Sequence, residues 1–342
     1  MALLCDETYL DNKNPQIKMS AIMGLGLAYA GSQRDVLKDS LLPILTDSSL
    51  SLELSAMAAV SLGMMFVGSS DGDISTPILQ LLMERDEAQL KDKWTQFLAL
   101  GLSLLFVGRQ EDAEPVLEAL KTIENPIGKS TSVLVTGCAF AGTGNVIKFQ
   151  ELLEECQDHI DTSEGGDDTF QAYAVLGIAL IAMGEDIGSE MALRQFGHLM
   201  HYGESVIRKT VPLAMGLLNA SNPQMKVYDT LSRYSHDNDN DVAVNAIFSM
   251  GLVGAGTNNA RLAQLLRQLA SYYHRDPNTL FMVRIAQGLL HMGKGTLSVN
   301  PFHTERSVLS RVSTASLLTV LVSLVEAKSC MFLPPWPYEH LN

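Results

Sequence analysis

The sequence predicts an all-α solenoid, a stack of helix-turn-helix units built on one repeated motif. Three observations lead to this fold class: a glycine that recurs every 34 to 42 residues, small residues seven and five positions before it, and an amphipathic segment after it. A fixed period of this length is typical of repeat arrays. We call the recurring residue the marker. The markers are Gly31, Gly68, Gly108, Gly142, Gly184, Ser221, Gly256 and Gly293.

The segment before each marker is expected to be a nearly apolar helix. In the first copy, Ala21–Gly31, the small residues are Gly24 and Gly26, and large apolar side chains surround them. Each glycine inside a helix costs about 1 kcal/mol relative to alanine. Because the chain repeats this unfavourable choice, we expect the small faces of neighbouring helices to pack closely. The fourth copy has Val135 at the first small position but keeps Gly137 at the second.

The segment after each marker is expected to be an ordinary helix with one polar face. A single pair of such helices cannot bury the apolar helix, so the units must stack. These second helices are predicted at Val36–Leu45, Ile74–Glu84, Ala113–Ile123, Val146–Cys156, Met191–His201 and Ala260–Ala270.

Length and composition agree with an intracellular repeat protein. A chain of 342 residues exceeds a usual single core, but a solenoid adds core with every unit. No stretch reaches the roughly 18 apolar residues of a membrane span, and the N-terminus lacks a signal-peptide layout. The cysteines (Cys5, Cys138, Cys156 and Cys330) are far apart, so we expect reduced thiols. These features predict the cytoplasm and nucleus, with no membrane partner.

The net charge of −14 is concentrated in about one third of the chain. Residues 47–168 contain 21 acidic and 7 basic residues, whereas residues 1–46 have a balance of −1 and residues 169–342 one of +1. Such a surface repels nucleic acid, which is therefore not expected as a partner. Charge alone leaves two interpretations open: a basic protein partner steered to this surface, or a solvated face that keeps an apolar array soluble.

The chain is expected to divide into four parts. Repeats one to four occupy residues 1–160, and an acidic linker, DTSEGGDD, occupies 161–168. Repeats five to eight follow in residues 169–327, and the last helix, Ser313–Ala327, is expected to begin a ninth unit. Residues 328–342 form a divergent tail whose prolines cannot continue a helix.

Several strings resemble chemical sites, but the repeat explains them better. Glycine-rich strings that resemble phosphate loops recur with the structural period and follow no predicted strand. His236–Asp241 alternates carboxylates like a calcium loop, but Val242 replaces the required glycine; we expect a turn in which Asp241 caps the next helix. His198 and His201 share a helix without a third ligand. No serine or cysteine has a recognisable base. The sequence therefore predicts no catalytic residue, no cofactor and no metal site.

The recurring motif resembles the proteasome/cyclosome repeat, and the second half of the chain carries a closer likeness. The stretches Gly197–Leu217, Ser235–Tyr273 and Arg284–Thr296 resemble the family of the largest non-ATPase subunit of the proteasome regulatory-particle base. The resemblance covers residues 1 to about 326 and is most specific over 169–296. It implies repeats curved into a toroid, with apolar helices inside and half-polar helices outside.

The chain departs from the family pattern at both ends. The family has a helical region and further repeats before the position of residue 1, and a β-rich closing segment after the last repeat. Residues 328–342 do not resemble that segment. We therefore expect a chain truncated at both ends relative to the family.

The family binds ubiquitin and ubiquitin-like domains on three consecutive outer helices, which align with Asp73–Glu84, Glu111–Ile123 and Asn145–Cys156. These segments lie in the acidic third of the chain. Ubiquitin-type domains present an apolar patch ringed by basic residues, so a receptor needs apolar ground flanked by carboxylates. The residues expected to form this surface are Asp73, Pro77, Gln80, Leu81, Glu84, Asp112, Glu118 and Glu151.

The first of these helices carries the strongest part of the expectation. Its five residues share one stripe at i, i+4, i+7, i+8 and i+11 spacing, and Asp73 and Glu84 match family contact positions. Gln80 stands where some family members have aspartate. The three residues on the other two helices are placed by helix and charge alone.

The resemblance implies a non-catalytic scaffold that supports proteasome assembly and ubiquitin-dependent degradation. Its expected partners are the ATPase-ring subunits, other regulatory-particle subunits, ubiquitin chains and the ubiquitin-like domains of shuttle factors. The alternative is a generic adaptor of the HEAT or armadillo kind, unrelated to degradation. The glycine-rich first helix distinguishes the two, because those adaptors build it from larger residues.

Overall fold

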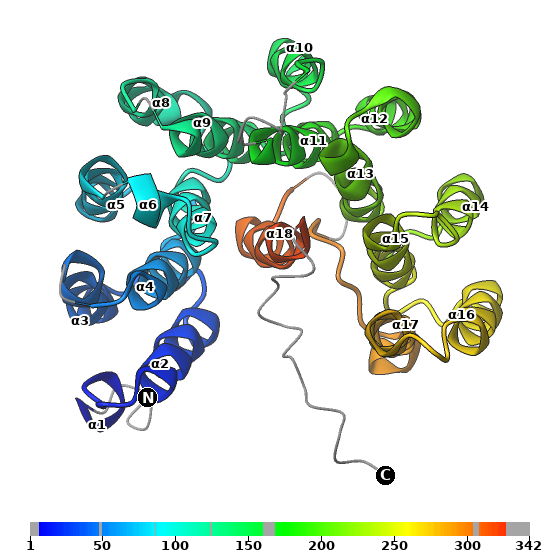
Figure 1. Ribbon diagram of the computed structural model, residues 1–342, viewed down its shortest axis with the longest axis horizontal. Helices are drawn as coiled ribbons and strands as arrows, with labels where there is room; N and C mark the ends of the chain where they lie inside the picture. The colour runs from blue at the N-terminus through cyan, green and yellow to red at the C-terminus, as the bar shows by residue number, and fades with distance from the viewer. Residues whose placement is uncertain are drawn as a thin grey trace.

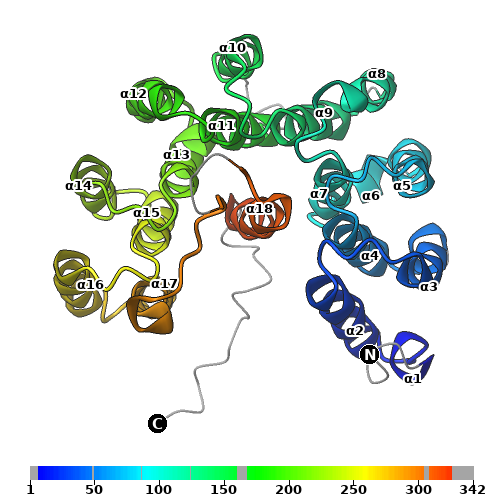
Figure 2. The same cartoon turned by 180° about the vertical axis from the view of Figure 1, so that it is seen from behind.

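The computed structural model describes residues 7–47, 50–85, 87–123, 125–159, 168–303 and 308–325. Two concentric rows of helices follow an open arc, with α2 and α17 at the ends of the inner row (Figures 1 and 2). The inner row contains α2 (Pro15–Ala28), α4 (Leu52–Met65), α7 (Thr95–Leu105), α9 (Pro126–Ala139), α11 (Thr169–Ala182), α13 (Ser205–Leu218), α15 (Asn240–Val253) and α17 (Pro277–Leu290). The outer row contains α3 (Asp35–Thr46), α5 (Gly72–Glu84), α8 (Glu114–Lys121), α10 (Val146–Glu155), α12 (Asp186–Tyr202), α14 (Met225–Tyr234) and α16 (Ala260–Tyr272). The predicted all-α solenoid is confirmed.

The inner row forms the core because its helices touch one another almost backbone to backbone. A Cβ atom added to Gly63 would lie 2.5 Å from the carbonyl oxygen of Gly101, and one added to Gly251 would lie 2.6 Å from the Cα atom of Ala286. Real Cβ atoms essentially never come closer than 3.0 Å to a non-bonded atom. The close packing predicted from the small residues is therefore confirmed, and it explains why the chain accepts glycine inside these helices.

The markers end the inner helices and bond each unit to the next. The described markers other than Gly184 adopt left-handed conformations, with φ between 54° and 72°, which glycine adopts without strain. The last carbonyls of a helix lack a partner within the helix. For six inner helices, the marker of the preceding unit supplies the missing N–H donor. The bonds of this kind run from the N–H groups of Gly31, Gly68, Gly108, Gly142, Ser221 and Gly256 to the carbonyls of Met64, Leu104, Cys138, Leu180, Leu252 and Leu289 at 2.8 to 3.1 Å.

Ser221 shows why one copy uses serine as its marker. Its φ of 54° is unfavourable for a residue with a side chain. Its hydroxyl donates to the carbonyl of Ala255 at 2.9 Å and accepts from the N–H of Val299 at 2.9 Å. These bonds offset the strain and attach the segment after α17 to the sixth unit.

The outer helices agree with the predicted segments, with three differences. α12 begins at Asp186, five residues before the predicted start at Met191. The segment predicted as one helix over Ala113–Ile123 is a 3-10 turn, η1 (Gln110–Ala113), followed by the eight-residue α8. The sixth unit has an outer helix, α14, for which no segment was predicted.

The cap of α15 differs from the prediction. The carboxylate of Asp239 accepts from the N–H of Asp241 at 3.1 Å, so Asp239 is the N-cap and the helix begins at Asn240. Asp241 lies in the first turn, 3.1 Å from the ammonium group of Lys209. The prediction that Asp241 caps this helix is therefore wrong, and the two aspartates have different partners.

The last described helix, α18 (Arg311–Val325), lies inside the arc (Figures 1 and 2). A ninth stacked unit would lie against α17, whereas α18 contacts α4, α7 and α13. Arg311 anchors its start by donating to the carbonyl of Gly68 at 3.3 Å. Leu318 and Leu321 are buried. The expectation that Ser313–Ala327 begins a ninth unit is therefore wrong. α18 lies inside the arc, where the inner row covers its apolar side chains.

Two of the four cysteines lie in the described part of the chain. Cys138 and Cys156 are free and buried, as predicted for reduced thiols. The other two cysteines, most of the predicted linker 161–168 and the tail 328–342 lie outside the described residues. No helix among the described residues is both long and apolar enough to cross a membrane.

Candidate interaction surface on the outer helices

The predicted surface residues lie on three neighbouring helices of the outer row, α5, α8 and α10, with η1 leading into α8 (Figure 1). On α5, Asp73, Gln80 and Glu84 are exposed, and Pro77 and Leu81 between them are half-buried. The stripe predicted from helical spacing therefore faces outward. The half-buried apolar side chains of this stripe are flanked by carboxylates at both ends.

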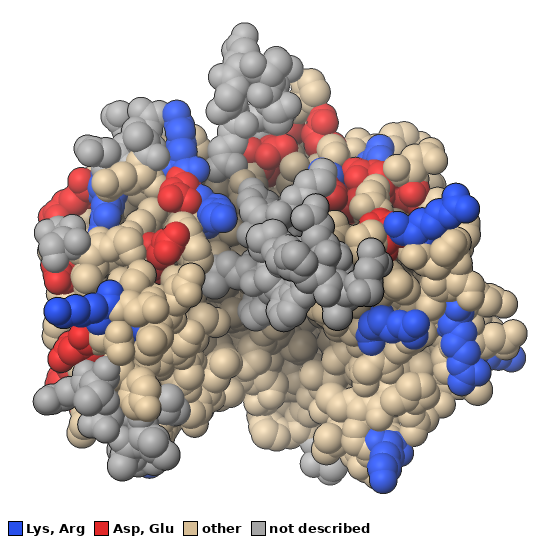
Figure 3. Space-filling view, turned by 60° about the horizontal axis from the view of Figure 1, so that its bottom comes forward, with Lys and Arg blue, Asp and Glu red and all other residues tan. Residues whose placement is uncertain are grey.

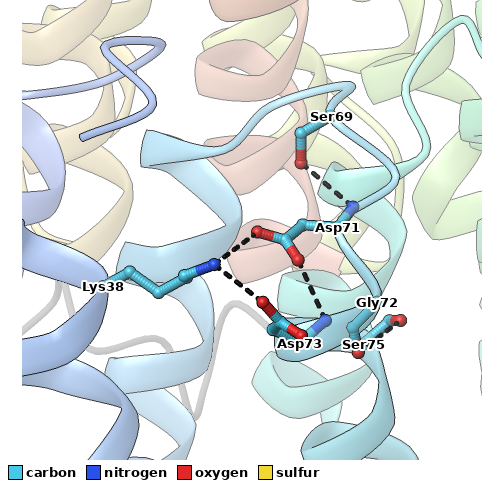
Figure 4. A network of polar contacts seen from close by, with 6 residues as sticks. All are labelled: Lys38, Ser69, Asp71, Gly72, Asp73 and Ser75. Carbon is cyan, nitrogen blue, oxygen red and sulfur yellow. Dashed lines mark hydrogen bonds and ion pairs between the residues drawn. The ribbon is translucent and has the colours of Figure 1, made fainter. Parts of the chain in front are cut away.

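A cap fixes the start of α5. The carboxylate of Asp71 accepts from the N–H of Asp73 at 2.9 Å, and the hydroxyl of Ser69 accepts from the N–H of Asp71 at 3.2 Å (Figure 4). Because such caps fix the first turn of a helix, the position of Asp73 is set by the backbone. Sequence reasoning placed Asp73 but missed Asp71, although an aspartate two residues earlier is a recognisable cap signal.

Lys38 on α3 holds the two carboxylates at the start of α5. Its Nζ atom lies 3.0 Å from Oδ2 of Asp73 and 3.1 Å from Oδ2 of Asp71 (Figure 4). The Lys38 and Asp71 side chains are 14% and 19% exposed, whereas Asp73 is 74% exposed. Two hydrogen bonds, the stronger contribution from Asp73 and the next from Asp71, raise the pKa of Lys38 above its usual range. Asp73 is thus an outward carboxylate that already has one cation partner.

The sequence contained a signal for Lys38 that the prediction did not use. Lys38 precedes Asp73 by 35 residues, which is about one repeat period. Residues one period apart occupy equivalent places on neighbouring units, so oppositely charged residues at that separation are candidates for a contact.

The carboxylates predicted on the other two helices are also exposed. Asp112 lies in η1, with Oδ2 at 3.9 Å from Nη1 of Arg109. Glu151 on α10 lies 2.7 Å from the ammonium group of Lys148. Glu118 on α8 is exposed, and no described basic side chain lies within ion-pair distance of it. The surface therefore combines carboxylates that have a basic partner with Glu118, which has none among the described residues.

This arrangement suits recognition rather than covalent chemistry. Its side chains are carboxylates, amides and aliphatic groups, and Met83 adds an exposed apolar side chain to α5. The described residues contain no group of three His, Cys, Asp or Glu side chains that could hold a metal ion. Burial raises the pKa of both Cys138 and Cys156 to about 12, which keeps these thiols protonated and unreactive near neutral pH.

Comparison with known families defines the class of this helical-repeat protein. The proteasome/cyclosome repeat family matches residues 20–53 and 245–277. The first match covers most of α2, all of α3 and the first residues of α4, and the second covers most of α15 and all of α16. The chain thus contains proteasome/cyclosome repeats toward both ends of its helical array.

Curated relatives narrow this class to proteasome regulatory subunits. The 26S proteasome regulatory subunit rpn-1 of Neurospora crassa is 64% identical over 331 residues, covering 96% of this chain and 37% of the relative. The 26S proteasome regulatory subunit rpn1 of Schizosaccharomyces pombe is 57% identical over 303 residues, covering 88% and 34%. The 26S proteasome non-ATPase regulatory subunit 2 of Dictyostelium discoideum is 46% identical over 323 residues, covering 94% and 35%. The chain is a relative of these regulatory subunits and spans about a third of their length.

Proposed function

We propose that this chain is a non-catalytic scaffold of the proteasome regulatory particle that binds ubiquitin and ubiquitin-like domains through α5, α8 and α10. The observation that carries the proposal is the exposed stripe on α5, in which carboxylates flank half-buried apolar side chains. The similarity to proteasome regulatory subunits supports the setting. ATPase-ring subunits, other regulatory-particle subunits, ubiquitin chains and shuttle factors are the proposed partners, and the cytoplasm and nucleus the proposed location.

The geometry supports such binding in two ways. The carboxylates at 47–168 create a field that attracts a basic patch from a distance and raises its association rate. At contact, Pro77 and Leu81 offer apolar area between Asp73 and Glu84. Because the helix that carries these residues packs on the inner row, the surface is held in its binding geometry before a partner arrives.

A generic HEAT or armadillo adaptor is the alternative function. The proteasome/cyclosome repeat match and the backbone contacts at Gly63 and Gly251 argue against it. Co-purification from cells separates the two proposals, since only the proteasome scaffold is expected to bring down ATPase-ring subunits. Their absence from the purified material, with other proteins present, would favour the adaptor.

Replacement of the two end carboxylates tests the binding surface. We expect Asp73→Ala combined with Glu84→Arg to weaken binding of a shuttle-factor ubiquitin-like domain at least tenfold, because pairing is lost and a like charge is introduced. Calorimetric titration measures this affinity. Wild-type affinity should also fall with added salt, since exposed charge pairs are screened over about 8 to 10 Å.

A charge-matched variant controls for the change in net charge. Asp11→Ala combined with Asp229→Arg removes the same number of negative charges and adds one positive charge, at exposed positions outside the surface. This variant should bind like the wild type. Equal affinities for all three proteins would leave the acidic third as a solubilising face.

A further inference from the structure

A groove between the outer helices α12 and α14 contains a cavity of about 390 Å³, within the usual range of ligand sites of about 300 to 1,000 Å³. Leu193 and Gly197 of α12 line one wall, Val227 of α14 lines the other, and Met215 of the inner helix α13 lines the floor. The cavity lies within the array, with α10 beyond one wall and α16 beyond the other (Figures 1 and 2). Its walls are therefore formed by helices inside the described arc.

Gly197 keeps this cavity open. It lies in the interior of α12, where glycine costs about 1 kcal/mol relative to alanine. An added Cβ atom there would have no neighbour within 4 Å, so close packing does not explain this glycine as it explains those of the inner row. The missing side chain instead leaves room for a ligand in the wall of the cavity.

The charged side chains around this cavity are cationic. Lys226 and Arg233 lie seven positions apart on one face of α14, and His201 lies in the last turn of α12. All three residues are exposed, and no described carboxylate lies within ion-pair distance of them. Asp229, the acidic residue of α14, does not line the cavity. The cavity is thus a cationic site in a chain of net charge −14.

Two hydroxyl groups accompany these cations. Nη2 of Arg233 donates to Oγ1 of Thr230 at 3.5 Å, which keeps the guanidinium on the face of α14 that lines the cavity. Burial raises the pKa of Tyr234 above its usual value, so its hydroxyl stays protonated and can donate a hydrogen bond. The cavity therefore offers donors of several kinds to one acceptor-rich ligand.

The repeat relates this face of α14 to the stripe on α5. Four residues that line the cavity follow the marker Ser221 by 5, 9, 12 and 13 positions, and they are Lys226, Thr230, Arg233 and Tyr234. The same four positions after Gly68 are Asp73, Pro77, Gln80 and Leu81. One face of the outer helix therefore carries a carboxylate in one unit and two cations in another, so the two surfaces should select ligands of opposite charge.

The other end of the same groove is acidic. A second cavity, of about 680 Å³, adjoins the first at Leu193, which lines both. Its charged residues are Glu185, Asp186 and Glu190 at the start of α12, and no described basic side chain lies within ion-pair distance of them. Glu190 precedes His201 by 11 positions, or about 16 Å at 1.5 Å per residue. Figure 3 shows basic side chains along the side of the molecule that carries the second half of the arc, with acidic ones gathered near its upper edge.

We infer that this groove binds a phosphorylated serine or threonine in an extended segment of a partner protein, with the phosphate among Lys226, Arg233 and His201. A phosphate monoester carries nearly two charges and three acceptor oxygens, so it can use several of these donors at once, whereas a carboxylate brings one charge and two oxygens. Basic residues of the segment would lie at the acidic end of the groove. An extended chain at about 3.3 Å per residue crosses 16 Å in about five residues. The acidic end also repels a polyanion such as nucleic acid.

A fluorescent peptide of 13 residues tests this inference. It has phosphoserine at its centre and two arginines at each end, so that either chain direction brings arginines to the carboxylates. One twin has serine at the centre and another has glutamate. Fluorescence anisotropy with the full chain should show that the phosphopeptide binds at least tenfold more tightly than the serine twin and at least threefold more tightly than the glutamate twin. The serine twin is the most basic of the three, so general attraction to an acidic chain would give the opposite order.

Variants locate the binding within the groove. Arg233→Glu and Gly197→Leu should each weaken phosphopeptide binding at least tenfold, the first by reversing a charge and the second by filling the cavity. Glu190→Lys should weaken it two- to fivefold, because it repels the arginines. Gly197→Ala adds only a Cβ atom and should bind within twofold of the wild type. Arg267→Glu makes the same change of charge at an exposed position of α16 outside the cavity, and should bind like the wild type.

Circular dichroism melts verify that every variant is folded before its binding is compared. The inference is overturned if either twin binds as tightly as the phosphopeptide, or if the Arg233 and Arg267 variants bind alike. It is also overturned if inorganic phosphate or a single-stranded DNA of ten thymidines displaces the labelled peptide at the same concentration as unlabelled phosphopeptide, because the occupant would then be a free anion or a nucleic acid. Asp73→Ala combined with Glu84→Arg leaves this groove intact and should bind the phosphopeptide like the wild type, so a failure of the proposed function is distinguishable from a failure of this inference.

Discussion

The inner and outer rows of this solenoid obey different rules, although the same repeat generates both. Seven of the eight described inner helices are 14 residues long, and the exception, α7, has 11. The described outer helices vary from 8 residues in α8 to 17 in α12. Backbone contacts and marker bonds fix the inner helices, whereas the outer helices have a free face. The inner row therefore sets the geometry of the array, and the outer row is free to vary toward recognition.

The energies of the two rows should differ accordingly. Substitutions in close-packed interiors typically change the free energy of unfolding by 1 kcal/mol or more, whereas exposed charges contribute about 0 to 1 kcal/mol. Substitutions in the inner row are therefore expected to appear in stability, and those in the outer row in binding.

Overpacking of the inner row should have the largest effect. We expect Gly63→Leu to lower the free energy of unfolding by about 1 to 3 kcal/mol. The reason is that its Cβ atom would lie 2.5 Å from the carbonyl oxygen of Gly101, which is backbone and cannot rotate away. Urea denaturation followed by circular dichroism measures the change.

The same substitution at an open glycine provides the control. Gly197 lies inside the outer helix α12, and an added Cβ atom there has no neighbour within 4 Å. Gly197→Leu should leave the stability unchanged or raise it, because leucine is the better helix former. If both variants had the urea midpoint of the wild type, the expected difference in stability between the two rows would not rest on backbone packing.

The inner row could be predicted from the sequence because its constraints are local and periodic. Gly63 and its equivalents recur at fixed distances from the markers, and their contacts follow that period. The exposed stripe from Asp73 to Glu84 could also be predicted, since helical spacing alone defines one face. The assignment of this stripe to ubiquitin-type partners came from the family resemblance and remains a prediction.

The features that were missed depend on contacts that no local pattern encodes. The apolar sequence of α18 is compatible both with a stacked unit and with packing inside the arc, and only the covering inner row decides between them. The ion pair of Lys38 joins two units across 35 residues, so only the repeat period, and no local pattern, could have indicated it. At the start of α15, two aspartates two residues apart were equally suited to cap the helix, and the competing partner Lys209 of Asp241 was not visible in the sequence.

The two buried thiols predict that stability depends on pH. This tests whether the contribution of a residue to stability depends on its burial or on the row to which its helix belongs. Cys138 lies in the inner helix α9 and Cys156 at the end of the outer helix α10, yet burial raises both pKa values to about 12. Because each thiol ionises more easily in the unfolded chain, stability is fully present below about pH 9 and falls as the pH rises toward 12. At pH 10 each thiol should lower the free energy of unfolding by about 1.4 kcal/mol.

Urea denaturation at pH 8, 9 and 10 checks this effect. Cys138→Ala and Cys156→Ala should each be less stable than the wild type at pH 8, because a buried side chain is shortened. Each variant should also lose less stability than the wild type between pH 8 and pH 10. Identical pH dependence in the wild type and both variants would show that the thiols ionise without unfolding.

The smallest expected effect lies where the two roles of the outer row meet, at Lys38. We expect Lys38→Met to lower the free energy of unfolding by about 1 kcal/mol, since Asp73 is 74% exposed, and Asp71, which is 19% exposed, keeps its hydrogen bond from the N–H of Asp73. The methionine keeps the apolar stem of the side chain. The same variant should raise the affinity for a ubiquitin-like domain about two- to threefold, because Asp73 is no longer partly neutralised from within.

The opposite signs of these two changes make the variant informative. Lys209→Met, which removes a lysine 3.1 Å from Asp241 at the junction of α13 and α15, should lower stability and leave binding unchanged. Calorimetric titration and urea denaturation on the same preparations provide both numbers. If Lys38→Met weakened both binding and stability, the ion pair with Lys38 would be what orients Asp73 toward the partner. The outer row would then need its own internal contacts for recognition, as the inner row needs them for stability.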